Sequence, residues 1–229
     1  MFVLGITGGI GCGKSTLAKI FQEYSVPVLD ADRISHEVTQ AGSPVLTELR
    51  NILPENCFQA DGSLAAEETA RLIFNNKKML DAVSLLIHEE VTKKLINGVQ
   101  QAKEAKLPLI VLDVPLPVKQ GFLDQCDYVV VVWANSAERL ERLEKRGLNK
   151  TEAEQRIACQ MSREEYAKIA DLVIDNSGDI EDLYRAFHKL VKDELNSRGI
   201  FSVSYTHLRA HETDSYLVCR LLLEKKKKE

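Results

Sequence analysis

The chain has 229 residues, of which 45% are hydrophobic, so it can bury the core of a complete domain. Its formal net charge of -4 and its pI of about 5.8 argue against nucleic-acid binding driven by overall charge. The five cysteines are scattered and form no C-x-x-C pair, which argues against a disulfide framework and a zinc site. No apolar run approaches the ~20 residues that span a bilayer, and no basic leader precedes the first apolar run. We therefore expect a soluble cytoplasmic protein that binds neither nucleic acid nor membrane. We also expect a monomer, which none of these observations determines.

The first predicted element is a short strand over residues 2–6, and a phosphate-binding motif follows it. Residues 8–16 read Gly8-Gly9-Ile10-Gly11-Cys12-Gly13-Lys14-Ser15-Thr16, which contains G-x-x-x-x-G-K-S between a buried strand and an amphipathic helix. The glycines let backbone N–H groups turn inward as an anion nest. Lys14 supplies a cation for the β- and γ-phosphates, and Ser15 supplies a hydroxyl for Mg²⁺. The alternative is a glycine-rich turn that precedes a lysine by chance. The full motif spacing between a buried strand and an amphipathic helix argues against it.

A second strand over residues 26–29 leads into Asp30-Ala31-Asp32. The carboxyl ends of parallel strands form the functional edge of an α/β sheet, so these acids are expected to face the γ-phosphate. A kinase needs a carboxylate there that orients an acceptor hydroxyl and takes its proton. Aspartate is also favoured at helix N-caps and turns, so one of the two acids could serve only as a cap or turn residue. We favour Asp32 as the catalytic acid.

Residues 40–75 are rich in turn formers and predict an insertion with short helices. The apolar stripe that continues beyond them predicts a longer helix, and it consists of Leu80, Val83, Ile87, Val91 and Leu95. The next strand, over 109–112, ends at Asp113, which is the pattern of an acid that holds Mg²⁺ directly or through water.

Further strands are predicted at 128–133 and 172–174, with a densely charged segment at 136–170 between them. We expect this segment to form two helices joined by a mobile turn near 146–150. Arg139, Arg142 and Arg146 share one helical face; we predict that Arg139 is solvated and that the other two belong to a lid over the nucleotide. Asn149-Lys150-Thr151-Glu152 looks like a guanine-reading motif but follows a helix break, so we reject that match.

The five apolar runs are continuous rather than alternating, which is typical of parallel strands buried on both faces. The predicted fold is therefore α/β, a three-layer α/β/α P-loop NTPase fold with a parallel five-stranded sheet. We expect one domain over residues 1–199, with a helical acceptor-side insertion at about 40–100 and a helical lid at about 136–170. Residues 202–229 resemble translated sequencing-adapter DNA, so 200–229 are expected to be a non-native or disordered tail.

Taken in chain order, the motifs also resemble the dephospho-CoA kinase family over about residues 1–198. The resemblance is carried by residues 7–16 and by Asp30-Ala31-Asp32, Asp113-Val114-Pro115-Leu116, Cys126-Asp127-Tyr128, Arg142-Leu143 with Arg146, Arg156-Ile157 with Gln160, Ala170-Asp171 and Asn176. It implies ATP-dependent phosphorylation of the ribose 3′-hydroxyl of dephospho-coenzyme A, with ATP and Mg²⁺ bound.

The resemblance also implies roles for individual residues. Asp32, Lys14 and Arg142 would be catalytic, and Asp32, His88 and Asp113 would bind the acceptor. ATP would be bound by Gly11, Cys12, Gly13, Lys14, Ser15, Thr16, Arg142, Arg146 and Asn176. Mg²⁺ would be held by Ser15 and Asp113. A lone histidine on an amphipathic helix is more often structural, and this alternative stays open for His88.

The chain departs from the family pattern at several positions, which bear on acceptor affinity more than on phosphoryl transfer. Glu89 replaces a proline after His88, and Pro117, Val118 and Lys119 replace Leu-Phe-Glu. Arg139 stands where glutamine is frequent, and Tyr166 where lysine is common. Two other functions remain open: another P-loop kinase acting on a nucleoside monophosphate or small hydroxylated metabolite, and a non-catalytic nucleotide-binding switch.

Overall fold

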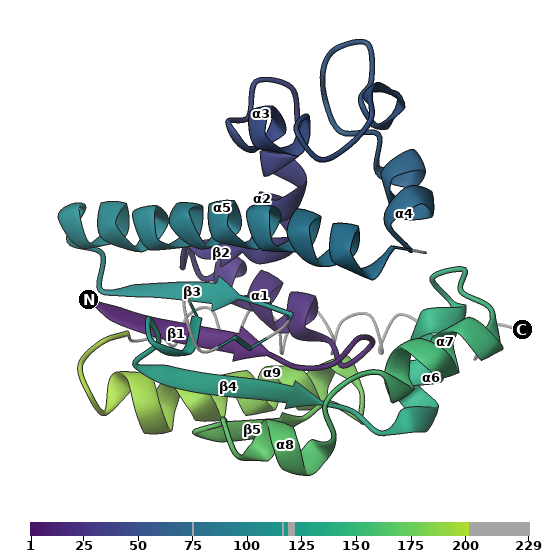
Figure 1. The fold of residues 1–229 in the computed structure, drawn as a ribbon. Coiled ribbons are helices and arrows are strands. Elements are labelled where there is room, and N and C mark those ends of the chain that lie inside the picture. Colours follow the sequence, from purple (N-terminus) through teal and green to yellow (C-terminus); the bar gives the residue numbers. More distant parts are fainter. Residues whose placement is uncertain (75, 116, 119–121, 202–229) are drawn as a thin grey trace, which may run out of the picture. The chain divides into compact units, whose positions relative to one another are not determined.

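The computed structural model describes residues 1–74, 76–115, 117, 118 and 122–201, and the strands within them form one parallel sheet (Figure 1). Its five strands lie in the order β2-β3-β1-β4-β5, which confirms the predicted sheet. Their bounds are β1 (Phe2–Thr7), β2 (Val28–Asp30), β3 (Leu109–Asp113), β4 (Tyr128–Trp133) and β5 (Leu172–Asp175). β1, β3 and β4 read as nearly unbroken apolar runs because both of their faces are covered by protein.

Helices join these strands, as the βαβ pattern predicts. α1 (Lys14–Glu23) connects β1 to β2, and α9 (Ile180–Leu190) follows β5. Between β2 and β3 lie α2 (Ala31–Val38), α3 (Val45–Leu49), the 3-10 turn η1 (Glu55–Cys57), α4 (Ala66–Phe74) and α5 (Lys77–Glu104). The predicted short helices and the predicted long helix of this insertion are therefore present.

The described residues up to Phe187 form one compact unit, and those from His188 to Phe201 belong to a second. The described part of the second unit contains the end of α9 and the π-helical turn η3 (Val191–Asn196). The predicted tail lies beyond the described residues except for Ile200 and Phe201. The predicted domain boundaries stay a prediction.

The core of the first unit has two layers of helices with the sheet between them. One cluster joins Val3, Ile110 and Leu112 of the sheet to Val91 and Leu95 of α5. On the other face α1 and α9 meet, where the rings of Phe21 and Phe187 pack edge to face with centroids 4.9 Å apart. This is the three-layer α/β/α arrangement that the strand and helix pattern predicts.

The segment 136–170 corrects the prediction of two helices, because it contains three. These are α6 (Ser136–Glu144), α7 (Lys150–Ala158) and α8 (Arg163–Ala167). Ser162 and Glu165 form a capping box that begins α8, with Ser162 Oγ accepting from Glu165 N and Glu165 Oε2 accepting from Ser162 N. The turn before α7 was predicted, and Gly147 occupies it with φ of 90°.

Two aspartates tie neighbouring strands together at the amino-terminal edge of the sheet. Asp127 N donates to Val3 O, and Asp127 Oδ2 accepts from Val3 N at 2.8 Å. Asp171 repeats this pattern with Val129, whose N–H donates to Asp171 Oδ2 at 2.7 Å. Each carboxylate therefore satisfies a backbone N–H at the start of a strand, far in sequence from its own position. These aspartates align the strands at the edge opposite the predicted site.

Replacing Asp127 with alanine should lower the free energy of unfolding by about 1–2 kcal/mol, because the N–H of Val3 loses a charged hydrogen-bond acceptor. Chemical denaturation followed by circular dichroism measures this change. Asp81→Ala is the matched control, since Asp81 is exposed on α5. Equal stability of the two variants would contradict the structural role of Asp127.

Candidate active site

The loop between β1 and α1 has the backbone that the glycine motif predicts. Gly8, Gly11 and Gly13 have φ values of 144°, 77° and 96°, which side chains other than glycine rarely adopt. A Cβ on Gly8 would also clash with Val132 O of β4. Gly13 is the N-cap of α1 and provides no side-chain cap, so the first N–H groups of the helix remain open to an anion.

Three consecutive carbonyls of this loop are held by side chains from outside it. Ile10 O accepts from Arg139 Nε at 2.9 Å, Gly11 O from Arg142 Nη1 at 3.3 Å, and Cys12 O from Asn176 Nδ2 at 2.8 Å. In a planar trans peptide the N–H points opposite to the C=O. Holding the carbonyls of Ile10 and Cys12 outward therefore directs the N–H groups of Gly11 and Gly13 toward the opposite side, where the motif predicts the phosphates, whereas the N–H of Cys12 donates to Gly9 O at 3.2 Å.

Arg139 contradicts the prediction of a solvated arginine. Its side chain is only 2% exposed, and its Nη2 donates to Gln160 Oε1 at 2.6 Å. It lies on the same face of α6 as the buried Leu143, four residues later. That apolar neighbour was the sequence signal for burial. Gln160, which also accepts from Ile10 N at 2.8 Å, had no local signal of its own beyond the family likeness.

Arg142 and Arg146 line a small cavity beside the loop, together with Gly13, Thr16, Asn176 and Gly178. The cavity has a volume of about 170 Å³. Arg142 Nη2 also donates to Asn176 O at 2.8 Å, so α6 and the end of β5 are joined here. The structure thus brings together Arg142, Arg146 and Asn176, which the sequence predicted as nucleotide ligands.

Acidic side chains meet Lys14 at the carboxyl edge of β2 and β3. Asp30 and Asp113 are direct partners in the strand register, and Asp113 is opposite Ile6 of β1. Burial raises the pKa of Asp113 to about 6; the nearby Lys14 ammonium lowers this pKa, and Asp30 and Asp32 raise it. Partial desolvation likewise raises the pKa of Asp32, and Lys14 again acts in the opposite direction.

The two aspartates at the start of α2 have different surroundings. Asp30 is the N-cap of α2, and its Oδ1 accepts from Arg33 N at 3.0 Å. Asp32 lies in the first turn of α2, and its side chain lines a cavity. The structure thus gives Asp30 the capping role that the sequence left open for one of the two.

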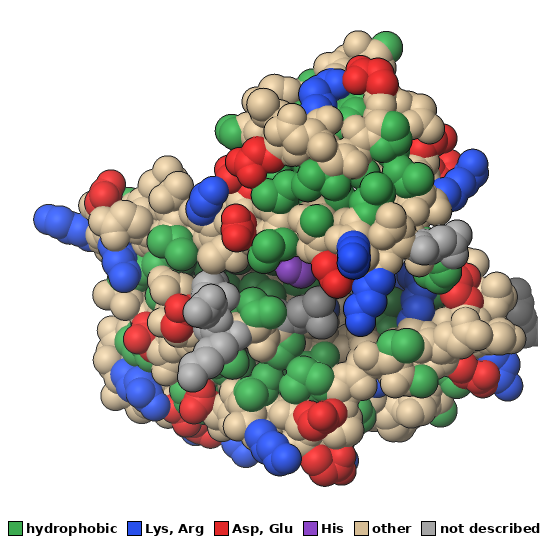
Figure 2. All heavy atoms as spheres, viewed as in Figure 1, with side chains coloured by type: hydrophobic (Ala, Val, Ile, Leu, Met, Phe, Trp, Pro, Cys, Tyr) green, Lys and Arg blue, Asp and Glu red, His purple; other side chains and the backbone are tan. Residues whose placement is uncertain are grey.

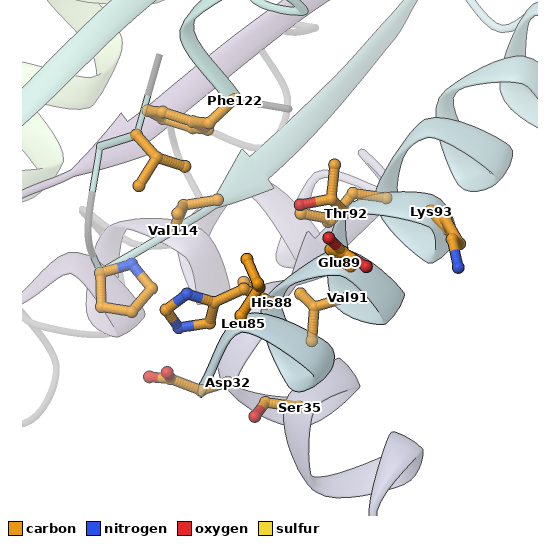
Figure 3. Close-up of a pocket in the computed structure, with 14 residues that line it drawn as sticks. Asp32, Ser35, Leu85, His88, Glu89, Val91, Thr92, Lys93, Val114 and Phe122 are labelled. Atoms are coloured by element: carbon orange, nitrogen blue, oxygen red, sulfur yellow. The ribbon is translucent and has the colours of Figure 1, made fainter. Parts of the chain in front are cut away.

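The cavity beside Asp32 has a volume of about 600 Å³ and is lined mainly by apolar side chains. It lies between α2, α5 and the segment after β3, and Figure 2 shows a hollow on this face with hydrophobic side chains around it. The side chains of His88, on α5, and Asp32, on α2, project to the same side, whereas the amine of Lys93 extends to the other side of α5 (Figure 3). Of the positions that depart from the family pattern, Glu89 and Val118 line this cavity. Lys119 lies outside the described residues.

The Asn149-Lys150-Thr151-Glu152 sequence has a structural explanation. Asn149 is the N-cap of α7, and its Oδ1 accepts from Glu152 N at 2.8 Å. Tyr166, another departure from the family pattern, is buried against Trp133 with ring centroids 6.2 Å apart.

A phosphate loop after β1, its lysine, and acids facing it beside a cavity of small-molecule size define a P-loop kinase. A family model described as dephospho-CoA kinase matches residues 2–182, and the chain belongs to this family. It is 37% identical over 190 residues to the dephospho-CoA kinase of Bacillus licheniformis, which covers 82% of this chain and 94% of the relative. It is 38% identical over 187 residues to that of Leifsonia xyli, covering 81% of this chain and 94% of the relative.

Solved structures show the same fold. A protein from Thermus thermophilus superposes with a TM-score of 0.70 at 32% identity, covering 84% of this chain and 97% of that one. A dephospho-CoA kinase from Campylobacter jejuni has a TM-score of 0.66 at 21% identity, covering 87% of this chain and 98% of that one. Among the helices of the described residues, none is long and apolar enough to cross a membrane.

The pKa of Asp113 makes a prediction for the protein without nucleotide or metal. Because this pKa is raised from 3.8 to about 6, the folded state binds the proton more tightly than the unfolded chain does. The free energy of unfolding should therefore fall as pH rises from about 4 to 6, by roughly 2–3 kcal/mol from this group. Asp113→Asn should remove that contribution and be the more stable protein at pH 7.5. Urea unfolding in EDTA at pH 4.5 and 7.5 measures the free energy of unfolding of the wild type and of Asp113→Asn. If the difference between the two proteins were the same at both pH values, the prediction would be contradicted.

Proposed function

We propose that this chain transfers the γ-phosphoryl group of ATP to the ribose 3′-hydroxyl of dephospho-coenzyme A, giving coenzyme A and ADP. The observation that supports this most directly is the position of Asp32, which lines the 600 Å³ cavity and is close enough to Lys14 for the ammonium to lower its pKa. An acceptor hydroxyl in that cavity would lie between a carboxylate and the phosphate loop. The names of the relatives supply the identity of the acceptor.

In the proposed reaction, Asp32 accepts the proton of the 3′-hydroxyl while the 3′-oxygen of the acceptor forms a bond to the γ-phosphorus. The bond from that phosphorus to the β,γ-bridging oxygen breaks, and ADP leaves. Lys14, Arg142 and the N–H groups of the loop that no carbonyl of the loop accepts, such as that of Gly11, stabilise the negative charge on the phosphates. The raised pKa of Asp32 favours proton acceptance, because a more basic carboxylate has a larger driving force for it.

Arg146 and Asn176 would hold the nucleotide beside the loop, since both line the small cavity there. His88 would contact the acceptor beside Asp32, since both side chains line the larger cavity and project to the same side (Figure 3). The segment 136–170 would serve as the lid that excludes water, as its arginines and its helices on both sides of Gly147 suggest. We infer that the protein acts as a cytoplasmic monomer.

Ser15 and Asp113 provide the hydroxyl and carboxylate oxygens that suit Mg²⁺. Among the described residues no three His, Cys, Asp or Glu side chains cluster as a metal site, which fits an ion held largely by nucleotide phosphates. When bound, Mg²⁺ neutralises charge on the β- and γ-phosphates.

An acceptor screen tests the proposed function. With ATP and Mg²⁺, dephospho-coenzyme A should give a kcat/KM at least about tenfold above adenosine monophosphate or shikimate, because its ribose and diphosphate arm fill the cavity. ADP release measured by a coupled assay provides the comparison. Equal turnover of all acceptors would indicate another P-loop kinase, and ADP release independent of acceptor would indicate a nucleotide-binding switch.

Asp32→Asn should lower kcat by about 10²–10⁴-fold, since it removes the general base while keeping the size of the side chain. ATP affinity should change little, because the phosphates are held by the loop and Lys14. Steady-state kinetics and calorimetric titration with ATP separate the two effects. Asp30→Asn is the matched comparison: it should affect mainly stability, through the cap of α2. Normal turnover of Asp32→Asn would exclude Asp32 as the base.

A further inference from the structure

Arg139 of α6 places a buried positive charge on the outer side of the phosphate loop. Its guanidinium donates to Ile10 O and to Gln160 Oε1, and its central carbon lies 5.4 Å from the centroid of the Trp133 ring. None of the ion pairs found within the described parts of the chain includes Arg139. Its charge is therefore met by oxygen dipoles and an aromatic face, an unusual environment for a group that is costly to desolvate.

Gln160, just after α7, completes a closed set of hydrogen bonds with Arg139. Its Oε1 accepts from Ile10 N at 2.8 Å as well as from Arg139 Nη2 at 2.6 Å. Both backbone groups of Ile10 are thus bound by this pair. A Cβ on Gly9 would lie 2.6 Å from Arg139 Nη2 and 2.7 Å from Gln160 Oε1, so the pair lies directly against the loop.

This contact fixes the peptide that joins Ile10 to Gly11. Because Ile10 O points at Arg139, the N–H of Gly11 points to the opposite side. The backbone of α6 also packs on the loop, since a Cβ on Gly11 would lie 3.1 Å from Arg139 O. The orientation of the loop therefore depends on two residues of the segment 136–170, which are 129 and 150 residues away in sequence.

We propose that Arg139, together with Gln160, is a positioning residue for ATP, which holds the phosphate loop in its anion-binding shape and couples that loop to α6 and the end of α7. This inference rests on the proposed function. A neutral donor could hold the carbonyl equally well, but a cation behind the loop adds a field that attracts the triphosphate. Bound phosphate charge in turn supplies the counter-charge that Arg139 lacks within the described residues.

The test compares Arg139→Met with Arg163→Met. Arg163, in α8 of the same segment, is exposed and ion-paired to Asp175 at 3.9 Å, so it is the matched control. Melting temperature without nucleotide, its increase with Mg²⁺-ATP, and the KM values for ATP and dephospho-coenzyme A are measured for each. Arg139→Met leaves Ile10 O without its side-chain donor, so the protein without nucleotide should melt a few degrees below the wild type, and the effect of nucleotide is measured from that lower temperature.

Arg139→Met should raise the KM for ATP by about tenfold or more and reduce the nucleotide-induced increase in melting temperature, while the KM for dephospho-coenzyme A stays within about twofold. Arg139→Lys, which keeps the charge but not the paired hydrogen bonds, should lie between Arg139→Met and wild type. Gln160→Met should weaken ATP binding in the same direction. The double variant Arg139→Met/Gln160→Met should bind ATP no more weakly than Arg139→Met alone, because the two side chains act as one unit.

Wild-type ATP binding in Arg139→Met would overturn the positioning role, as would a loss confined to the melting temperature without nucleotide. If Arg139→Met does not fold, Gln160→Met decides: an unchanged KM for ATP overturns the role. A wild-type protein whose melting temperature does not respond to Mg²⁺-ATP would instead overturn the proposed function itself. The nucleotide measurement needs no acceptor, so the two failures are distinguishable.

Discussion

The active site depends on how the phosphate loop orients its peptide groups. A loop of glycines has many conformations, and only those with N–H groups gathered on one side bind an anion. In this chain, Arg139, Arg142 and Asn176 bind three consecutive carbonyls from outside and so select that side. The glycines make the conformation possible, and the three side chains make it the favoured one.

The same edge of the sheet must hold negative and positive groups close together. Strand register brings Asp30 beside Asp113, and α2 begins so that Asp32 follows within one turn. Burial raises the pKa of Asp113, Lys14 limits the increase, and repulsion from Asp30 and Asp32 adds to it. The Lys14 ammonium therefore offsets part of the cost of burying the Asp113 carboxylate before any phosphate binds.

The sheet and the site edge were predictable because their determinants are local. Continuous apolar runs indicate parallel strands, and a parallel sheet brings every strand end to one edge, where Asp32 and Asp113 were expected. The burial of Arg139 was not predicted because it depends on how α6 packs against a loop 129 residues earlier, and Leu143 was its only nearby sign. The third helix of the segment 136–170 had a readable signal, the S-x-x-E pattern at Ser162 and Glu165. The strand-tying role of Asp127 had none, since its partner Val3 lies 124 residues away.

Strand order divides the work of the site between two halves of the sheet. β1 is central, with β3 and β2 on one side and β4 and β5 on the other. The acids and the large cavity belong to the β2–β3 side, whereas Arg139, Arg142 and Asn176, which bind the loop carbonyls, belong to the β4–β5 side. The positions that depart from the family pattern therefore fall into two groups, one on each side of the sheet. Glu89 and Val118 line the 600 Å³ cavity, whereas Arg139 contacts the phosphate loop and Tyr166 packs against Trp133. Because only the phosphate loop is shared, the chain can change its contacts with one substrate without changing those with the other.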